Sequence, residues 1–165
     1  MYIDVLEKCV NFLGHPVMLR QNKNLLITIM VLASNLDPTD CPVDIVFVLD
    51  ASDSIGASDF NLMKSYVSRL VSSLDIDSGR IRVGIVTYNV ITSINLNAYS
   101  SVAGLQSAIS SLSYSGGSSN TAAALAYVRT RMLTSAAGDR SDVHNIVVVL
   151  THGRSINASS TEVSI

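Results

Sequence analysis

The amino-acid sequence predicts an α/β fold in which helices cover a mainly parallel sheet. Continuous runs of β-branched and aromatic residues are typical of strands buried on both faces, and they alternate with stretches whose apolar residues recur at helical spacing. From residue 44 onward the order is strand, helix, strand, strand, helix, helix and strand. This order is typical of a layered domain in which helices pack on a sheet.

The first strand and helix follow directly from these patterns. Ile45–Leu49 is an uninterrupted apolar run, which indicates a strand buried on both faces. Ser58 is expected to cap the next helix, with Asp59 in its first turn. The apolar residues of this helix lie at helical spacing: Phe60, Met63, Val67, Leu70, Val71 and Leu74.

The second half repeats both patterns. Ile81–Tyr88 is the next strand, and the alternation from Val90 to Leu96 predicts a half-exposed edge strand joined to it as a hairpin. Ser101 is expected to cap a short helix, a second helix follows Gly116-Gly117, and Asn145–Leu150 is the last buried strand. The apolar faces of the two helices are Val102, Leu105, Ile109 and Leu112, and then Leu125, Val128 and Met132.

Composition limits the classes of function. The chain has 165 residues, enough for one ordinary domain, and 48% hydrophobic with 15% charged residues excludes a largely disordered protein. The net charge is -2 and no Lys/Arg cluster occurs, so neither nucleic acid nor an anionic membrane surface is an expected partner. No apolar run reaches the roughly 18 residues of a transmembrane helix, so no membrane span is expected in this chain.

Residues 1–33 are predicted to be an N-terminal extension that contains a secretory signal peptide. Leu25–Ala33 is a short apolar run that follows Arg20 and Lys23 and ends with small residues, the order found at a signal cleavage site. The run lies deep in the chain, and a true start at Met18 would give a signal of ordinary length. The alternative is a buried strand or helix that packs on the domain.

Residues 34–43 are predicted to be a linker, because they are polar, include two prolines and show no periodicity. If the signal is cleaved, Cys41 is left as a single cysteine, whereas an uncleaved chain has the alternative of a Cys9–Cys41 bridge. Neither cysteine has the spacing of a zinc site or a redox pair. The domain itself is assigned to residues 44–165.

A motif of the form D-x-S-x-S, running from Asp50 to Ser54, follows the first buried strand. Its carboxylate and hydroxyl oxygens are ligands suited to a hard divalent cation such as Mg²⁺. In open α/β sheets, ligands bind in the crevice at the carboxyl ends of the strands, which is where this motif lies. The alternative is a Ser/Asp-rich turn that caps the following helix.

Four separated segments give a more specific identification. They are IVFVLDASDSIG at 45–56, RVGIVTY at 82–88, YSGGSSNTAAAL at 114–125 and IVVVLTHG at 146–153. In order and spacing they resemble the von Willebrand factor A family, most closely the domains of type VI collagens, matrilins and integrin α subunits. The resemblance implies a Rossmann-like three-layer fold with one antiparallel edge strand and helices on both faces.

The resemblance also implies a metal-ion-dependent adhesion site. Asp50, Ser52 and Ser54 match its first motif unchanged, and Ser119 stands where the family has a metal-binding threonine. His152 replaces the family's aspartate, which removes a negative charge and offers a softer ligand, so affinity for Mg²⁺ or Mn²⁺ is expected to be lower.

Domains of this family continue beyond the strand at Asn145–Leu150 with further helices and two more strands. The fold is therefore expected to be truncated after its fourth strand, and residues 44–165 to form a partial domain. The last strand would then become an exposed edge, which favours aggregation.

The function expected from the resemblance is adhesion or matrix assembly outside the cell. The partner would be an extracellular protein, such as collagen or another matrix protein, and no enzymatic activity is expected. Asn157 begins an N-glycosylation sequon, consistent with secretion. The alternatives are a nonfunctional fragment of a larger protein, or a serine hydrolase that uses Ser119, His152 and Asp50, although no nucleophile-elbow sequence is present.

Overall fold

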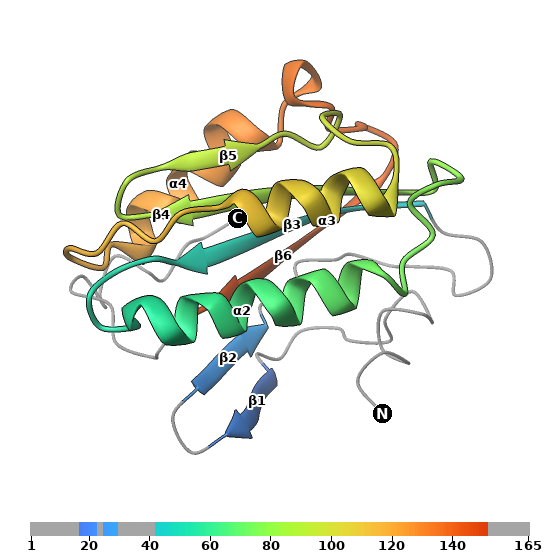
Figure 1. The fold of residues 1–165 in the computed structure, drawn as a ribbon. Helices are drawn as coiled ribbons and strands as arrows, with labels where there is room; N and C mark the ends of the chain where they lie inside the picture. The colour runs from blue at the N-terminus through green and yellow to red at the C-terminus, as the bar shows by residue number, and fades with distance from the viewer. Residues whose placement is uncertain (1–16, 23–24, 30–41, 152–165) are drawn as a thin grey trace.

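The computed structural model describes residues 17–22, 25–29 and 42–151 (Figure 1). The strands are β1 (Val17–Asn22), β2 (Leu25–Ile29), β3 (Val43–Asp50), β4 (Ile81–Tyr88), β5 (Thr92–Ile94) and β6 (His144–Leu150). The helices are α2 (Gly56–Val71), α3 (Val102–Ser111) and α4 (Thr121–Tyr127), and α4 continues into a π-helical turn, η1 (Val128–Met132). A 3₁₀ turn, η2 (Ser135–Ala137), precedes β6.

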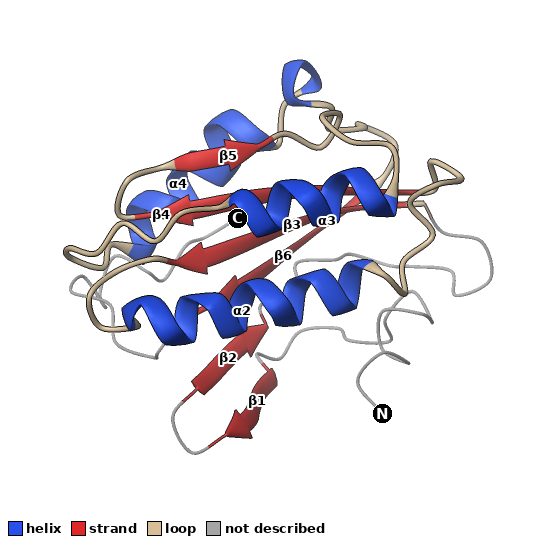
Figure 2. Ribbon diagram, viewed as in Figure 1, coloured by secondary structure: helices blue, strands red, loops and turns tan. Residues whose placement is uncertain are grey.

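The six strands form one sheet in the order β1-β2-β6-β3-β4-β5 (Figure 2). β3 is parallel to both of its neighbours, β4 and β6, and β5 is antiparallel to β4 as the sequence predicts. The α/β fold class is confirmed. The antiparallel part of the sheet is larger than expected, however, because β1 and β2 form an antiparallel pair at the opposite edge from β5.

β3 lies in the centre of the sheet, and its alternating side chains build two separate cores. Ile45, Phe47 and Leu49 pack into one hydrophobic cluster, whereas Val46 and Val48 pack into the other. All eight residues of β3 are buried, as the continuous apolar run predicts. A strand covered on both faces can hold its last residue, Asp50, in a fixed position at the edge of the sheet.

Helices cover both faces, as expected. α2 and α3 lie side by side in front of the sheet in Figure 1, and their apolar residues join the cluster of Phe47. α4 and η1 lie behind it and pack on Val46 and Val48. Gly84 in β4 permits this close packing, because a Cβ there would lie 2.9 Å from Cε of Met132 in η1.

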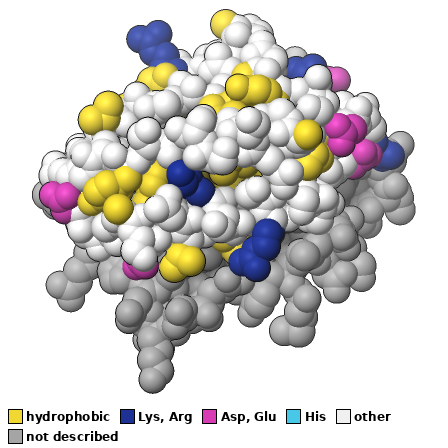
Figure 3. Space-filling view, viewed as in Figure 1, with side chains coloured by type: hydrophobic (Ala, Val, Ile, Leu, Met, Phe, Trp, Pro, Cys, Tyr) yellow, Lys and Arg dark blue, Asp and Glu magenta, His cyan; other side chains and the backbone are white. Residues whose placement is uncertain are grey.

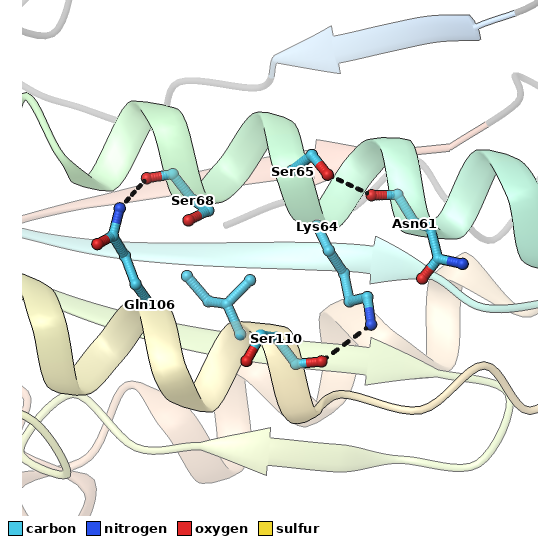
Figure 4. A pocket seen from close by; sticks show the side chains of 7 residues that line it. Asn61, Lys64, Ser65, Ser68, Gln106 and Ser110 are labelled. Atoms are coloured by element: carbon cyan, nitrogen blue, oxygen red, sulfur yellow. Dashed lines mark hydrogen bonds between the residues drawn. The ribbon is translucent and has the colours of Figure 1, made fainter.

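Polar side chains join α2 to α3 across the shallow pocket shown in Figure 4. The Lys64 ammonium donates to the carbonyl oxygens of Ser110 and Leu112, at 3.1 and 2.8 Å. Gln106 donates to the carbonyl oxygen of Ser68 at 3.0 Å.

The surrounding surface carries mostly uncharged side chains with isolated basic and acidic groups (Figure 3). Among the described residues, no helix is long and apolar enough to cross a membrane.

A buried ion pair lies at the end of β3 opposite to Asp50. Asp44, fully buried in β3, accepts from Nε and Nη2 of Arg140, at 3.0 and 2.6 Å, and from its backbone N–H at 3.0 Å. The same guanidinium donates to the carbonyl oxygens of Val43, Gly79 and Arg80. Arg140 therefore ties the segment before β6 to the beginnings of β3 and β4.

The predicted cap of the first helix is wrong. α2 begins at Gly56, and Ser58 and Asp59 lie inside it; the cap residue Ile55 makes no side-chain capping bond. The physical reason is the turn that follows β3, in which the N–H groups of Ile55 and Gly56 both donate to the Ser52 carbonyl oxygen. That turn leads the chain into the helix earlier than expected. The cap at Ser101 is confirmed, with its side chain accepting from Gly104 N–H at 3.2 Å.

The expected open edge at the last strand is wrong for part of β6. Thr28 and Ile27 of β2 pair with Val149 and Leu150, because the apolar run at Leu25–Ile29 supplies a strand for that edge. A strand at this position is the alternative that the sequence leaves open for residues 25–33. Cleavage of a signal peptide stays a prediction, and Cys9, Cys41, His152 and Asn157 lie outside the described residues.

Candidate metal centre

Three parallel strands end together at one edge of the sheet. Asp50 is the last residue of β3 and pairs in register with Tyr88, the last residue of β4. Leu49 pairs with Leu150 at the end of β6, which places Thr151 next to Asp50. In α/β sheets this carboxyl edge is the place where ligands bind. The candidate site residues that the structure describes meet here.

The Asp50 carboxylate is the centre of this arrangement. Its side chain is buried, and Oδ1 accepts the backbone N–H of Ser52 at 3.0 Å. Oδ2 accepts two hydroxyls, from Ser119 at 3.1 Å and from Thr151 at 2.9 Å. A buried carboxylate requires such donors, because an unpaired charge away from water is costly.

The other two hydroxyls come from the turn after β3. Oγ of Ser52 and Oγ of Ser54 are 2.8 Å apart. Ser52 is buried and Ser54 is exposed, so this pair runs from the interior of the site to its surface. The structure therefore brings together Asp50, Ser52, Ser54 and Ser119, all expected from the sequence.

Ser119 is placed by the loop that leads into α4. Asn120, the next residue, caps that helix by accepting the N–H of Ala123 at 3.0 Å. On the other side of Ser119, the Gly117 carbonyl oxygen accepts the N–H of Asp53 at 2.8 Å. Ser119 is thus held between a helix cap and a contact with the loop of Ser52 and Ser54.

Asp53 does not join the Asp50 cluster. Its carboxylate accepts the hydroxyl of Tyr114 at 3.2 Å and lies beside Gly116. Burial raises the pKa of the Tyr114 phenol, and the hydrogen bond and charge of Asp53 raise it further. Asp53 therefore contributes a negative charge next to the site from the loop side.

Tyr88, the last residue of β4, lies beside Asp50 in the sheet. Its hydroxyl lies 3.1 Å from Oγ1 of Thr121, and its ring packs into the cluster behind the sheet. Burial raises the pKa of Tyr88 to about 12, and the Asp50 charge adds to this effect. The neutral phenol is the form that this position favours.

Sequence reasoning missed the roles of Thr151, Tyr88, Thr121 and Tyr114. Tyr88 ends a buried strand and Thr151 directly follows one, so their positions at the carboxyl edge were a usable signal. Thr121 belongs to the segment that resembles the family's second metal-binding motif. Tyr114 begins the segment 114–125 that carries the resemblance, but its contacts depend on how two distant loops meet and were not predicted.

The donor set fits a hard divalent cation. Asp50 offers a carboxylate, and Ser52, Ser54, Ser119 and Thr151 offer hydroxyl oxygens, which suit Mg²⁺ or Mn²⁺ better than soft metals. Ser119 and Thr151 direct their protons at Asp50, which leaves their lone pairs free for another partner. Within the described part of the chain, no group of three His, Cys, Asp or Glu side chains could hold a metal, and the other oxygens gathered around Asp50 are hydroxyls.

Comparison with known families identifies this arrangement. A family model for the von Willebrand factor type A domain matches residues 44–164. The chain belongs to this family. The match covers β3 to β6 and the loops of the candidate site, so the Rossmann-like architecture expected from the sequence is confirmed.

Relatives of this von Willebrand factor A domain include matrix proteins. The collagen alpha-4(VI) chain of Mus musculus is 37% identical over 118 residues, which cover 69% of this chain and 5% of the collagen chain. Matrilin-2 of Mus musculus is 33% identical over 121 residues, covering 70% of this chain and 13% of the matrilin. The chain thus spans a small part of the relatives that it matches.

A solved structure with a similar fold contains a bound metal. Proximal thread matrix protein 1 from the mussel byssus, in a form with a zinc-occupied MIDAS motif, superposes with a TM-score of 0.58 and 26% identity. The match covers 67% of this chain and 28% of the mussel protein. A protein with the same fold and 26% sequence identity thus holds a divalent metal in its MIDAS motif.

Proposed function

We propose that this domain is a non-enzymatic adhesion module that binds an extracellular protein ligand at the carboxyl edge of the sheet, with a divalent metal held by Asp50, Ser52, Ser54 and Ser119. The observation that carries the proposal is the buried Asp50 carboxylate, which accepts the hydroxyls of Ser119 and Thr151 beside the Ser52–Ser54 pair. These groups form an oxygen-rich site that opens to solvent through Ser54.

Each residue has a distinct role in this proposal. Asp50 provides the negative charge and orients the hydroxyls around it. Ser52, Ser54 and Ser119 provide neutral oxygens, which leave a bound cation with net positive charge. Mg²⁺ or Mn²⁺ in this site would offer an open coordination position to a carboxylate of the protein ligand.

The chain belongs to a secreted or extracellular-matrix protein, as its collagen and matrilin relatives indicate. Collagen or another matrix protein is the partner that we propose. Two large apolar side chains support a protein partner: Val90 and Ile91, in the turn after β4, are 63% and 42% exposed at the same edge of the sheet. Exposed apolar groups beside a polar site are typical of protein-binding surfaces.

Calorimetry tests the metal site. MgCl₂, MnCl₂ and ZnCl₂ are titrated into the full chain after removal of divalent ions with EDTA. We expect saturable binding of Mg²⁺ or Mn²⁺ that weakens about tenfold or more in Ser52→Ala and in Ser119→Ala. Ser118→Ala, which alters an exposed neighbour of Ser119, is the matched control and should bind like the wild type.

The variant His152→Asp distinguishes a site that binds metal in the natural chain from one that has lost metal binding. An added carboxylate should tighten Mg²⁺ binding, because affinity for hard cations rises with ligand charge. If the natural chain gives no binding heat and only His152→Asp binds, the metal-dependent part of the proposal is wrong.

Two further measurements test adhesion and the absence of enzymatic activity. Binding to immobilised collagen should be lost in EDTA and in Ser52→Ala; binding that survives both would place the ligand surface elsewhere. A fluorophosphonate probe should not label the chain. Labelling that disappears in Ser119→Ala would instead support the hydrolase.

A further inference from the structure

Two separate loops supply the hydroxyls of the candidate metal centre. Ser52 and Ser54 follow β3, whereas Ser119 precedes α4. Because these segments are far apart in the sequence, contacts between the loops, together with the bond from Ser119 to Asp50, are needed to hold their oxygens in a fixed arrangement. The structure contains contacts between the loops that do not use the candidate ligand hydroxyls themselves.

Tyr114 makes two of these contacts. Its hydroxyl donates to Oδ1 of Asp53 at 3.2 Å and also lies 3.4 Å from the carbonyl oxygen of Ser52. Its ring lies 6.1 Å from the ring of Phe60 in α2, at a tilted angle. The ring is therefore anchored on α2, while the hydroxyl fixes both the backbone of Ser52 and the side chain of Asp53.

Asp53 also contacts the loop that carries Ser119. Its N–H donates to the Gly117 carbonyl oxygen at 2.8 Å. A Cβ at Gly116 would lie 2.8 Å from Oδ1 of Asp53, and Gly116 has a φ of +66°. The positive φ favours glycine at position 116, and a side chain there would require the Asp53 carboxylate to move.

We propose that Tyr114 and Asp53 form a clasp that positions Ser52, Ser54 and Ser119 for metal binding. Neither residue of the clasp is a metal ligand. The inference deepens the proposed function and rests on it, since it assigns the residues that set the affinity of the same site.

Preorganisation is the physical reason for the effect. Neutral hydroxyls are weak ligands compared with carboxylates, so a site that relies on them gains affinity by having its oxygens in place before the cation arrives. Partners that orient metal ligands typically change affinity by about 10- to 100-fold when they are removed. A clasp between two ligand loops is expected to act in this range.

The test compares Mn²⁺ dissociation constants, measured by calorimetry on the full chain. The variants are Tyr114→Phe, which keeps the ring on Phe60 but removes the hydroxyl, Asp53→Ala, and the two combined. Asp53→Asn keeps an acceptor oxygen for Tyr114. Tyr99→Phe removes the hydroxyl of an exposed tyrosine and serves as the matched control.

We expect Tyr114→Phe and Asp53→Ala each to weaken Mn²⁺ binding by about tenfold, with the combined variant little weaker than either alone. Asp53→Asn should lose less affinity than Asp53→Ala, and Tyr99→Phe should lose none. Urea unfolding in EDTA reports the structural cost separately. A residue with only a structural role would lower stability and leave the dissociation constant of the folded protein unchanged.

The outcomes separate this inference from the proposed function. If the wild type binds Mn²⁺, Ser52→Ala abolishes binding and Tyr114→Phe binds like the wild type, the clasp is wrong and the metal site stands. Additive losses in the combined variant would also overturn the clasp, because the two residues would then act independently. If the wild type binds no metal, the metal site and the clasp both fail.

Discussion

Replacing Arg140 with Met should destabilise the domain more than a surface substitution. Asp44 is 0% exposed, and Arg140 supplies two side-chain hydrogen bonds to its carboxylate, the shorter at 2.6 Å. The Met variant keeps the apolar length of the side chain but leaves the carboxylate, among the described residues, with the backbone N–H of Arg140 as its one donor. It also removes the donor shared by the carbonyl oxygens of Val43, Gly79 and Arg80.

The expected loss is about 3 to 5 kcal/mol, the cost of breaking a buried ion pair by removing one partner. With a urea m-value of about 1 to 3 kcal/mol/M, the midpoint of unfolding should fall by roughly 2 M. Arg140→Lys keeps the charge but not the planar fork, so it should cost less than Arg140→Met. Asp44→Asn combined with Arg140→Met should recover part of the loss, since no charge then stays buried without a partner.

Urea denaturation followed by circular dichroism measures these differences. A loss below about 1 kcal/mol in Arg140→Met would refute the reasoning, because the pair would then behave as an exposed salt bridge. The pair lies at the opposite end of β3 from Asp50. Metal affinity of the folded Arg140→Lys variant should therefore be unchanged, and a change would show coupling between the two ends of the strand.

Three smaller predictions follow from single contacts. In EDTA, Tyr88 should contribute a loss of stability of about 2 to 3 kcal/mol between pH 10 and pH 12, because its pKa rises from 10.0 to about 12 on folding; Tyr88→Phe should remove this contribution in urea titrations and leave the smaller one from Tyr114. Ser101→Ala should cost about 1 kcal/mol in the same assay through loss of the cap on Gly104. Gly138→Ala should lower the melting temperature by several degrees, since φ is +92° and a Cβ would lie 2.6 Å from the backbone nitrogen of Asn97.

The strands were predictable because their signal is local. β4 has the predicted bounds, and β3 and β6 extend beyond theirs by one or two residues. Each carries enough consecutive apolar side chains to require burial on both faces. The start of α2 was not predictable from the capping signal at Ser58, since the turn held by the Ser52 carbonyl oxygen begins the helix at Gly56.

The N-terminal segment shows the limit of a short apolar run. Leu25–Ile29 has the composition of a signal core and equally of a strand. Its position as β2 depends on a free edge at β6, which lies more than 100 residues later in the chain. No window of local sequence contains that information.

The residues of the candidate site also differ in whether local sequence predicts them. Asp50, Ser52 and Ser54 belong to one short motif, which suggested them by itself. Ser119 required the resemblance to a family. Thr151 joins them only because β6 lies beside β3 in the sheet. The parts of the site that depend on strand order were therefore beyond a reading of the motif.

Within the described residues, one carboxylate lies inside the candidate centre, and four hydroxyls surround it. A single carboxylate attracts a cation weakly through charge, so in the proposed metal site we expect the affinity to depend on how rigidly the oxygens are held. Asp53 and Tyr114 join the two loops that carry the serine hydroxyls, while Asp50 orients Ser119 and Thr151 directly. In the metal site that we propose, the contacts between the loops would therefore set the geometry on which metal affinity depends.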